Sequence, residues 1–151
     1  YYDVNQALVA LDGTPIADAK SIADLKQHKL GAQIGTTSYA YITDQIQPSP
    51  KPSVYDTNND VISALKAKQI DGIVVDLPTA FFVTAVQVED GVIVGQFPNR
   101  GGRERFGMVF EQGNSLRRCV NRALNRLWAN GTIKRIQNRW LARAAGAPVI
   151  R

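Results

Sequence analysis

The stretch 71-DGIVVD-76 constrains the fold more than any other part of the sequence. Residues 73–75 are all apolar, so a strand here would present hydrophobic side chains to both faces of a sheet. Strands that are buried on both faces are typical of parallel sheets covered by helices. We therefore expect residues 70–76 to form a central, parallel strand of an α/β fold.

The segments around this strand alternate between the patterns of strands and helices. Apolar runs of strand length occupy residues 4–11, 30–34, 53–55 and 92–97. Helix signals lie between them: a capping box at Ser21 and Asp24, then helices expected over 38–45, after the cap residues 57–60, and over 77–88. This alternation predicts a mixed, mostly parallel sheet flanked by helices.

The charge of the chain changes abruptly near residue 99. Residues 1–99 hold 6 Lys and 11 Asp or Glu, whereas residues 100–151 hold 12 Lys or Arg and only Glu104 and Glu111. The step coincides with 98-PNRGG-102 and predicts a boundary between two structural parts. Beyond it we expect a strand over 106–111 and two amphipathic helices, which stop and restart at 130-NGT-132 and need an apolar surface to cover.

Several classes of function find no support in the sequence. His28 is the only histidine and Cys119 the only cysteine, so a common zinc site or a catalytic triad is not expected. No phosphate-binding loop or dinucleotide fingerprint occurs, and we expect no cofactor and no metal. The arginines of the two last helices could contact nucleic acid, but a solvated helix face is the favoured interpretation and no nucleic-acid partner is expected.

Two polar groups follow strands of the predicted sheet. Gly35-Thr36-Thr37-Ser38 comes after the strand at 30–34, and Asp76 ends the central strand. In α/β sheets ligands bind at the carboxyl ends of strands. Taken alone, the Thr-Thr-Ser segment is better explained as a helix cap, and Asp76 is equally well a helix cap or a ligand carboxylate. Together, hydroxyl donors and a carboxylate fit the two charged groups of a zwitterion.

The order of these motifs resembles the second half of the bacterial solute-binding proteins of family 3, the receptors of ABC importers for polar amino acids. The resemblance runs over nearly the whole chain, and its motifs are Tyr1-Tyr2-Asp3, 21-SIADL-25, 35-GTT-37, 55-YDT-57, 71-DGIVVD-76, 106-FGMVF-110, 130-NGTI-133 and Trp140-Leu141. It implies the type II fold of periplasmic binding proteins, a clamshell whose two lobes close on an amino acid.

The resemblance also implies roles for individual residues. Thr36 and Thr37 would donate to the α-carboxylate of the ligand, and Asp76 would accept from its α-ammonium group. Gln33, Ser38 and Val75 lie at positions that contribute to selection of the ligand side chain. The expected ligand is a polar or basic amino acid.

The resemblance divides the chain into two parts. Residues 4–97 would form the second lobe, and residues 98–151 would return across the hinge to supply a strand and two helices of the first lobe. The larger part of that lobe, with an arginine for the ligand carboxylate, would precede Tyr1. We therefore expect a fragment that binds its amino acid weakly when alone and that self-associates through its exposed C-terminal helices.

The function implied is binding without catalysis. The receptor would be periplasmic or extracellular, anchored as a lipoprotein in its full-length form, and would deliver its amino acid to an ABC permease. One alternative is an enzyme on the same fold, of the arogenate or prephenate dehydratase type; that chemistry needs an acid in the cleft, and we expect Glu89, Glu104 and Glu111 to lie outside it. Another alternative is the sensor module of a receptor or kinase.

Overall fold

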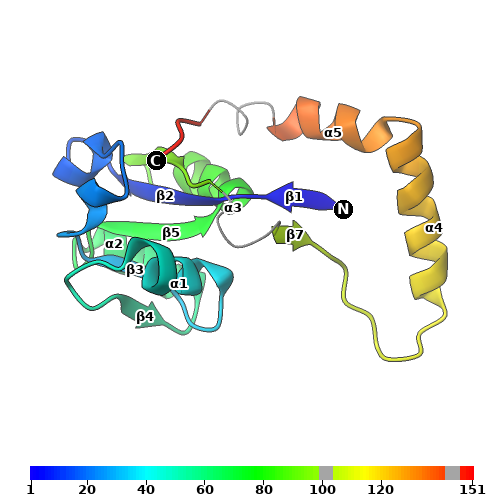
Figure 1. Ribbon diagram of the computed structural model, residues 1–151, viewed down its shortest axis with the longest axis horizontal. Coiled ribbons are helices and arrows are strands. Elements are labelled where there is room, and N and C mark those ends of the chain that lie inside the picture. The colour runs from blue at the N-terminus through cyan, green and yellow to red at the C-terminus, as the bar shows by residue number, and fades with distance from the viewer. Residues whose placement is uncertain (99–103, 142–146) are drawn as a thin grey trace.

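The structure, a computed structural model, describes residues 1–98, 104–141 and 147–151 of the chain (Figure 1). It consists of an α/β unit, a two-stranded ribbon that leaves this unit, and a pair of helices at the far end of the ribbon. Most of the predicted boundary at residues 98–102 lies outside the described residues. Among the described residues, no helix is both long and apolar enough to cross a membrane.

The α/β unit contains a five-stranded sheet with the order β4-β3-β5-β2-β6. Its strands are β2 (Gln6–Leu11), β3 (Leu30–Gln33), β4 (Ser53–Tyr55), β5 (Gly72–Asp76) and β6 (Gly91–Gln96). The central position predicted for β5 is confirmed. β5 runs parallel to β3 but antiparallel to β2, so the sheet is mixed and β5 is parallel on one side only.

Helices cover both faces of the sheet. The side chains of β5 alternate between two cores: Ile73 and Val75 face a core with α2 (Asn58–Lys66) and α3 (Leu77–Phe82), and Val74 faces a core with α1 (Thr37–Tyr41). Helices α1 and α3 each continue into a π-helical turn, Ile42–Ile46 and Val83–Gln87. Burial on both faces explains why residues 73–75 lack polar side chains.

The predicted helix after Ser21 is shorter than expected. The capping box forms, because Asp24 Oδ2 accepts hydrogen bonds from the N–H groups of Lys20 and Ser21 at 3.0 and 2.9 Å. These hydrogen bonds lower the pKa of the Asp24 carboxyl below its usual value. Only a 3₁₀ turn, Ala23–Leu25, follows, next to a similar turn at Pro15–Asp18.

The ribbon pairs β1 (Tyr2–Val4) with β7 (Glu104–Phe106), and its strands run antiparallel. The expected strand over 106–111 is wrong: the ladder ends at Tyr2 and Phe106, and no strand of the described residues pairs with 107–111. Residues 107–111 are irregular instead, and Val109 is 99% exposed.

The two predicted amphipathic helices are confirmed as α4 (Leu116–Ala129) and α5 (Thr132–Leu141). They pack on each other at the far end of the ribbon, away from the α/β unit (Figure 1). No side chain of α4 is buried, and Leu116, Trp128, Ile136 and Trp140 are large apolar side chains among the exposed ones. The apolar faces predicted from the spacing are thus largely uncovered.

The last five residues return to the α/β unit. Gln96 of β6 donates its N–H to Pro148 O at 2.7 Å, and the N–H of Ile150 donates to Gln96 O at 2.9 Å. Ile150 is only 1% exposed and belongs to the core shared with Leu8 and Phe97. The expectation that all of residues 98–151 lie on the far side of the hinge is therefore wrong for 147–151, because this apolar segment extends the sheet edge at β6.

Replacing Gly95 with alanine should displace this returning segment. A Cβ atom at Gly95 would lie 2.8 Å from both Pro148 O and Ile150 Cγ1, and a backbone carbonyl cannot move aside as a flexible side chain can. We expect the free energy of unfolding to fall by about 1–3 kcal/mol in a urea titration.

Gly107→Ala is the matched control, since a Cβ atom there meets nothing within 4 Å. It should leave the urea midpoint unchanged. An unchanged midpoint for Gly95→Ala as well would contradict the packing of residues 147–151 against β6.

Candidate functional site

A pocket of about 370 Å³ lies where the ribbon leaves the sheet. The carboxyl ends of the parallel strands β3 and β5 meet at this edge. The residues that line the pocket are Val4, Gln6, Thr36, Thr37, Ser38, Asn58, Val75, Asp76, Glu104, Arg105 and Phe106. Five of the six predicted site residues are therefore brought together. The sixth, Gln33, is not a lining residue, and its Nε2 donates to Asp56 O at 3.0 Å.

Asp76 is the N-cap of α3. Its Oδ1 accepts from the N–H of Thr79 at 2.9 Å, and its Oδ2 accepts from the Thr79 hydroxyl at 2.8 Å. A carboxylate has about four acceptor positions, so these two bonds leave capacity on both oxygens. The cap role is thus confirmed, and it does not exclude a ligand on the same carboxylate.

Thr36 is the N-cap of α1. Its hydroxyl oxygen accepts from the N–H of Tyr39 at 3.2 Å, and its hydroxyl proton is donated to Gln33 O at 2.7 Å. Gly35 precedes it with φ of 71°, a left-handed conformation that glycine adopts without strain. The helix-cap interpretation is confirmed for Thr36, and its hydroxyl proton is already donated within the protein.

A hydrogen-bond network joins α1, β2 and β7 within the pocket. Ser38 Oγ donates to Gln6 Oε1 at 2.6 Å, and Gln6 Nε2 donates to Glu104 Oε2 at 2.6 Å and to Thr37 Oγ1 at 3.2 Å. Thr37 Oγ1 donates in turn to Glu104 Oε2 at 3.1 Å. The hydroxyl of Thr37 therefore already points at a carboxylate.

Gln6 and Glu104 are pocket residues that the sequence interpretation missed. The expectation that Glu104 lies outside the cleft is wrong, because pairing of β7 with β1 carries Glu104 to the mouth of the pocket. Gln6 is only 3% exposed, and a polar residue inside the apolar run at 4–11 was a signal that could have found it. Glu104 is one of two acidic residues in a basic segment, which is a weaker signal.

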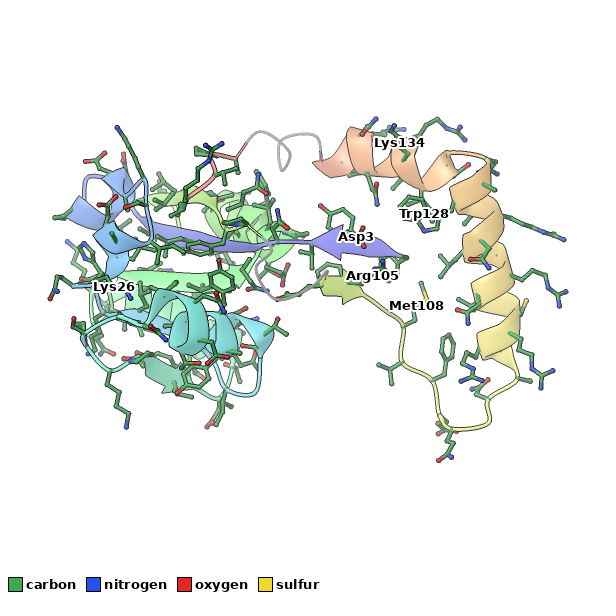
Figure 2. All side chains as sticks on the ribbon, in the orientation of Figure 1. Asp3, Lys26, Arg105, Met108, Trp128 and Lys134 are labelled. Carbon is green, nitrogen blue, oxygen red and sulfur yellow. The ribbon has the colours of Figure 1, made fainter. Side chains whose placement is uncertain are left out.

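Glu104 and Arg105 are neighbours on β7, and their side chains point to opposite faces of the ribbon because side chains alternate along a strand. Arg105, next to Glu104 on β7, directs its Nε to Asp3 Oδ1 of β1 at 3.0 Å, as Figure 2 shows. Burial, and secondarily the negative charge of Asp76, raise the pKa of the Tyr2 phenol. Glu104 and Asp76 are thus the two carboxylates among the described residues that line the pocket.

Comparison with known proteins places this geometry in context. No model of a protein family matches the chain. The ABC transporter arginine-binding protein 1 of Escherichia coli (strain K12) is 29% identical over 142 residues, which cover 93% of this chain and 56% of that protein. The chain thus spans a little more than half the length of this curated relative.

Solved structures agree in fold over most of the chain. A mutant of ArgBP from T. maritima matches with a TM-score of 0.71 and 25% identity, covering 94% of this chain and 59% of that one. An ancestral arginine-binding protein bound to arginine matches with a TM-score of 0.63 and 26% identity, covering 93% and 61%. The arginine-, lysine-, histidine-binding protein ArtJ from Geobacillus stearothermophilus, at 21% identity and a TM-score of 0.71, supports the fold alone.

These structures match the mixed sheet flanked by helices, so the predicted α/β fold of the periplasmic-binding-protein type is confirmed. The relatives are longer than this chain, which covers between 56% and 61% of each in the matches above. The chain is therefore similar, in sequence and in fold, to arginine-binding proteins, one of which is named as an ABC transporter arginine-binding protein.

Proposed function

We propose that this chain is part of a receptor that binds an amino acid between two lobes and delivers it to an ABC permease. One observation carries the proposal: in the pocket at the ends of β3 and β5, the hydroxyl of Thr37 donates to a carboxylate while Asp76 retains acceptor positions. A zwitterion needs that pair of complementary groups.

The roles proposed for the residues follow from their hydrogen bonds. Thr37 donates to the ligand α-carboxylate, and Asp76 accepts from the α-ammonium group beside its bonds to Thr79. Thr36 would have to release Gln33 O to donate directly, so its main contribution is to fix the turn that presents Thr37.

Side-chain selection falls to three further positions. Val75 lines the pocket and offers an apolar contact, and Ser38 lines it while bonded to Gln6. Gln33 acts on a ligand only after it leaves Asp56 O. The ligand class is a polar or basic amino acid, and arginine is the first candidate because several relatives are named arginine-binding proteins.

The packing supports a division of the chain into two lobes. Residues 4–97 together with 147–151 form one lobe, the β1–β7 ribbon belongs to the hinge, and α4 and α5 belong to the other lobe. The exposed apolar faces of α4 and α5 support this assignment, since several large apolar side chains gathered on one face normally have a partner. In isolation they favour self-association. The working location is periplasmic or extracellular, with lipoprotein anchoring in the full-length form.

An enzyme of the dehydratase type is a second candidate, because Glu104 places an acid in the pocket. Glu104 Oε2 accepts two hydrogen bonds, from Gln6 and from Thr37, so this oxygen is already held by donors of the protein. This arrangement favours binding over catalysis. Turnover of arogenate or prephenate by the chain would reverse that preference.

A nuclear magnetic resonance titration of the 151-residue chain tests the proposed binding. L-Arginine should shift the signals of Thr37 and Asp76 in the millimolar range, because one lobe supplies only part of the contacts. Argininamide, which lacks the carboxylate, and N-acetylarginine, which lacks the ammonium charge, should each bind more weakly. Equal shifts with all three compounds, or no shift with arginine, would contradict the proposal.

A further inference from the structure

Glu104 stands in the position proposed for the carboxylate of the ligand. Its Oε2 atom accepts from Thr37 Oγ1 at 3.1 Å and from Gln6 Nε2 at 2.6 Å. Thr37 comes from α1, Gln6 from β2 and Glu104 from β7, so this one oxygen connects the pocket to the strand that leaves the lobe. A ligand carboxylate that uses Thr37 therefore meets another carboxylate at the same hydroxyl.

The two carboxylates cannot share Thr37. A threonine hydroxyl has a single proton to donate, and that proton is already directed to Glu104. Two carboxylates at hydrogen-bonding distance from one oxygen atom also repel each other strongly. Binding at Thr37 thus requires Glu104 to move away.

We propose that Glu104 is an internal competitor of the amino acid, and that its displacement from Thr37 links occupancy of the pocket to the β1–β7 ribbon. The inference rests on the proposed function. Before binding, Glu104 fastens β7 to α1 through Thr37 and to β2 through Gln6. After binding it keeps only the bond to Gln6, and the ribbon loses its direct hydrogen bond to α1.

Replacement of Glu104 by the ligand at Thr37 should affect the angle between the lobes because of where Glu104 lies on the ribbon. Glu104 is paired with Val4, the last residue of β1, and Gln6 begins β2 two residues later. The network therefore spans the point where the ribbon joins the sheet, which is where a change of angle between the lobes must occur. A ligand that replaces Glu104 at Thr37 removes one constraint on that angle and so favours a different arrangement of the lobes.

Glu104→Gln tests the competition directly. Glutamine has nearly the same shape and still bonds to Gln6, but it lacks the charge that holds Thr37 and repels the ligand carboxylate. We expect arginine to bind about tenfold more tightly to this variant, as for loss of a competing hydrogen bond to a charged group. Argininamide, without a carboxylate, should bind equally to the variant and to the unmodified chain.

Glu111→Gln is the control, because it removes the same charge from the exposed segment after β7. It should change neither the affinity for arginine nor the affinity for argininamide. A second measurement needs no variant: the carboxyl carbon signal of Glu104 should move when arginine is added, and that of Glu111 should not.

The outcomes separate this inference from the proposed function. Weaker binding of arginine by Glu104→Gln would show that Glu104 contacts a cationic group of the ligand and would overturn the competition. Equal arginine binding by the variant and the unmodified chain, with a stationary Glu104 signal, would also overturn it while leaving the receptor function intact. Absence of arginine binding in all three chains would overturn both.

Discussion

Asp76→Asn should abolish measurable binding of arginine while the α/β unit remains folded. Asparagine is as good an N-cap as aspartate, so its side-chain oxygen can still accept from the N–H of Thr79, now bonded at 2.9 Å. The substitution removes the negative charge that would pair with the α-ammonium group. Loss of one partner of such a charge pair costs about 2–5 kcal/mol, enough to eliminate a millimolar affinity in the resonance titration.

Asp76→Ala separates the two roles of the carboxylate. It removes the cap as well as the charge, so we expect a further loss of about 1 kcal/mol in the free energy of unfolding, measured with urea. In both variants the pKa of Tyr2 should fall, since the charge of Asp76 contributes to its elevation, but it should stay above the ordinary value because burial is the larger cause. Undiminished arginine binding by Asp76→Asn would reduce Asp76 to a helix cap.

Ile150→Ala should lower the free energy of unfolding of the α/β unit by about 3 kcal/mol, as expected when a large core side chain is truncated. Ile150 is 1% exposed and packs in the core that contains Leu8 and Phe97. Its backbone N–H also bonds to Gln96 O at 2.9 Å, which holds the segment in register with β6. A urea titration followed by circular dichroism measures the change.

Val149→Ala is the matched control, because Val149 is the residue before Ile150 and is 48% exposed. It should cost less than about 1 kcal/mol, since little apolar area is lost. Equal effects of the two substitutions would mean that the last residues do not form part of the core.

Local features of the sequence predicted most of the α/β unit. The strand β5 was recognisable because burial on both faces leaves an uninterrupted apolar run, and α2 because Thr57 caps it and its apolar residues repeat at helical spacing. These signals arise from neighbouring residues, so they can be read without knowing the fold. The spacing on α4 and α5 was equally informative, although no side chain of α4 is buried in the described part of the chain.

Parts of the candidate site were also predictable. Thr37 and Asp76 each follow an apolar strand, and strands that run parallel present their carboxyl ends at one edge, so the pairing of these positions followed from the sheet. Thr36 and Asp76 were equally recognisable as helix caps, and both are. Their ligand roles remain predictions.

Contacts between distant residues were decided only by the tertiary structure. Glu104 meets Gln6 across 98 positions of the chain, and Ile150 contacts Gln96 although α4 and α5 lie between them in the sequence. Neither contact leaves a periodic pattern, because a single hydrogen bond or a single buried side chain depends on where a distant strand ends. The same holds for the antiparallel pairing of β2 with β5, which the local sequence does not distinguish from a parallel one.

The sequence by itself therefore determined most of the strands and helices, which faces of α4 and α5 are apolar, and which polar residues stand at strand ends. The tertiary structure alone decided that Glu104 enters the pocket, that Thr37 is bonded to it, and that residues 147–151 close the core. The reason is physical: secondary structure and capping are governed by interactions within a few residues, whereas the pocket depends on the pairing of β1 with β7, two strands that lie far apart in the sequence.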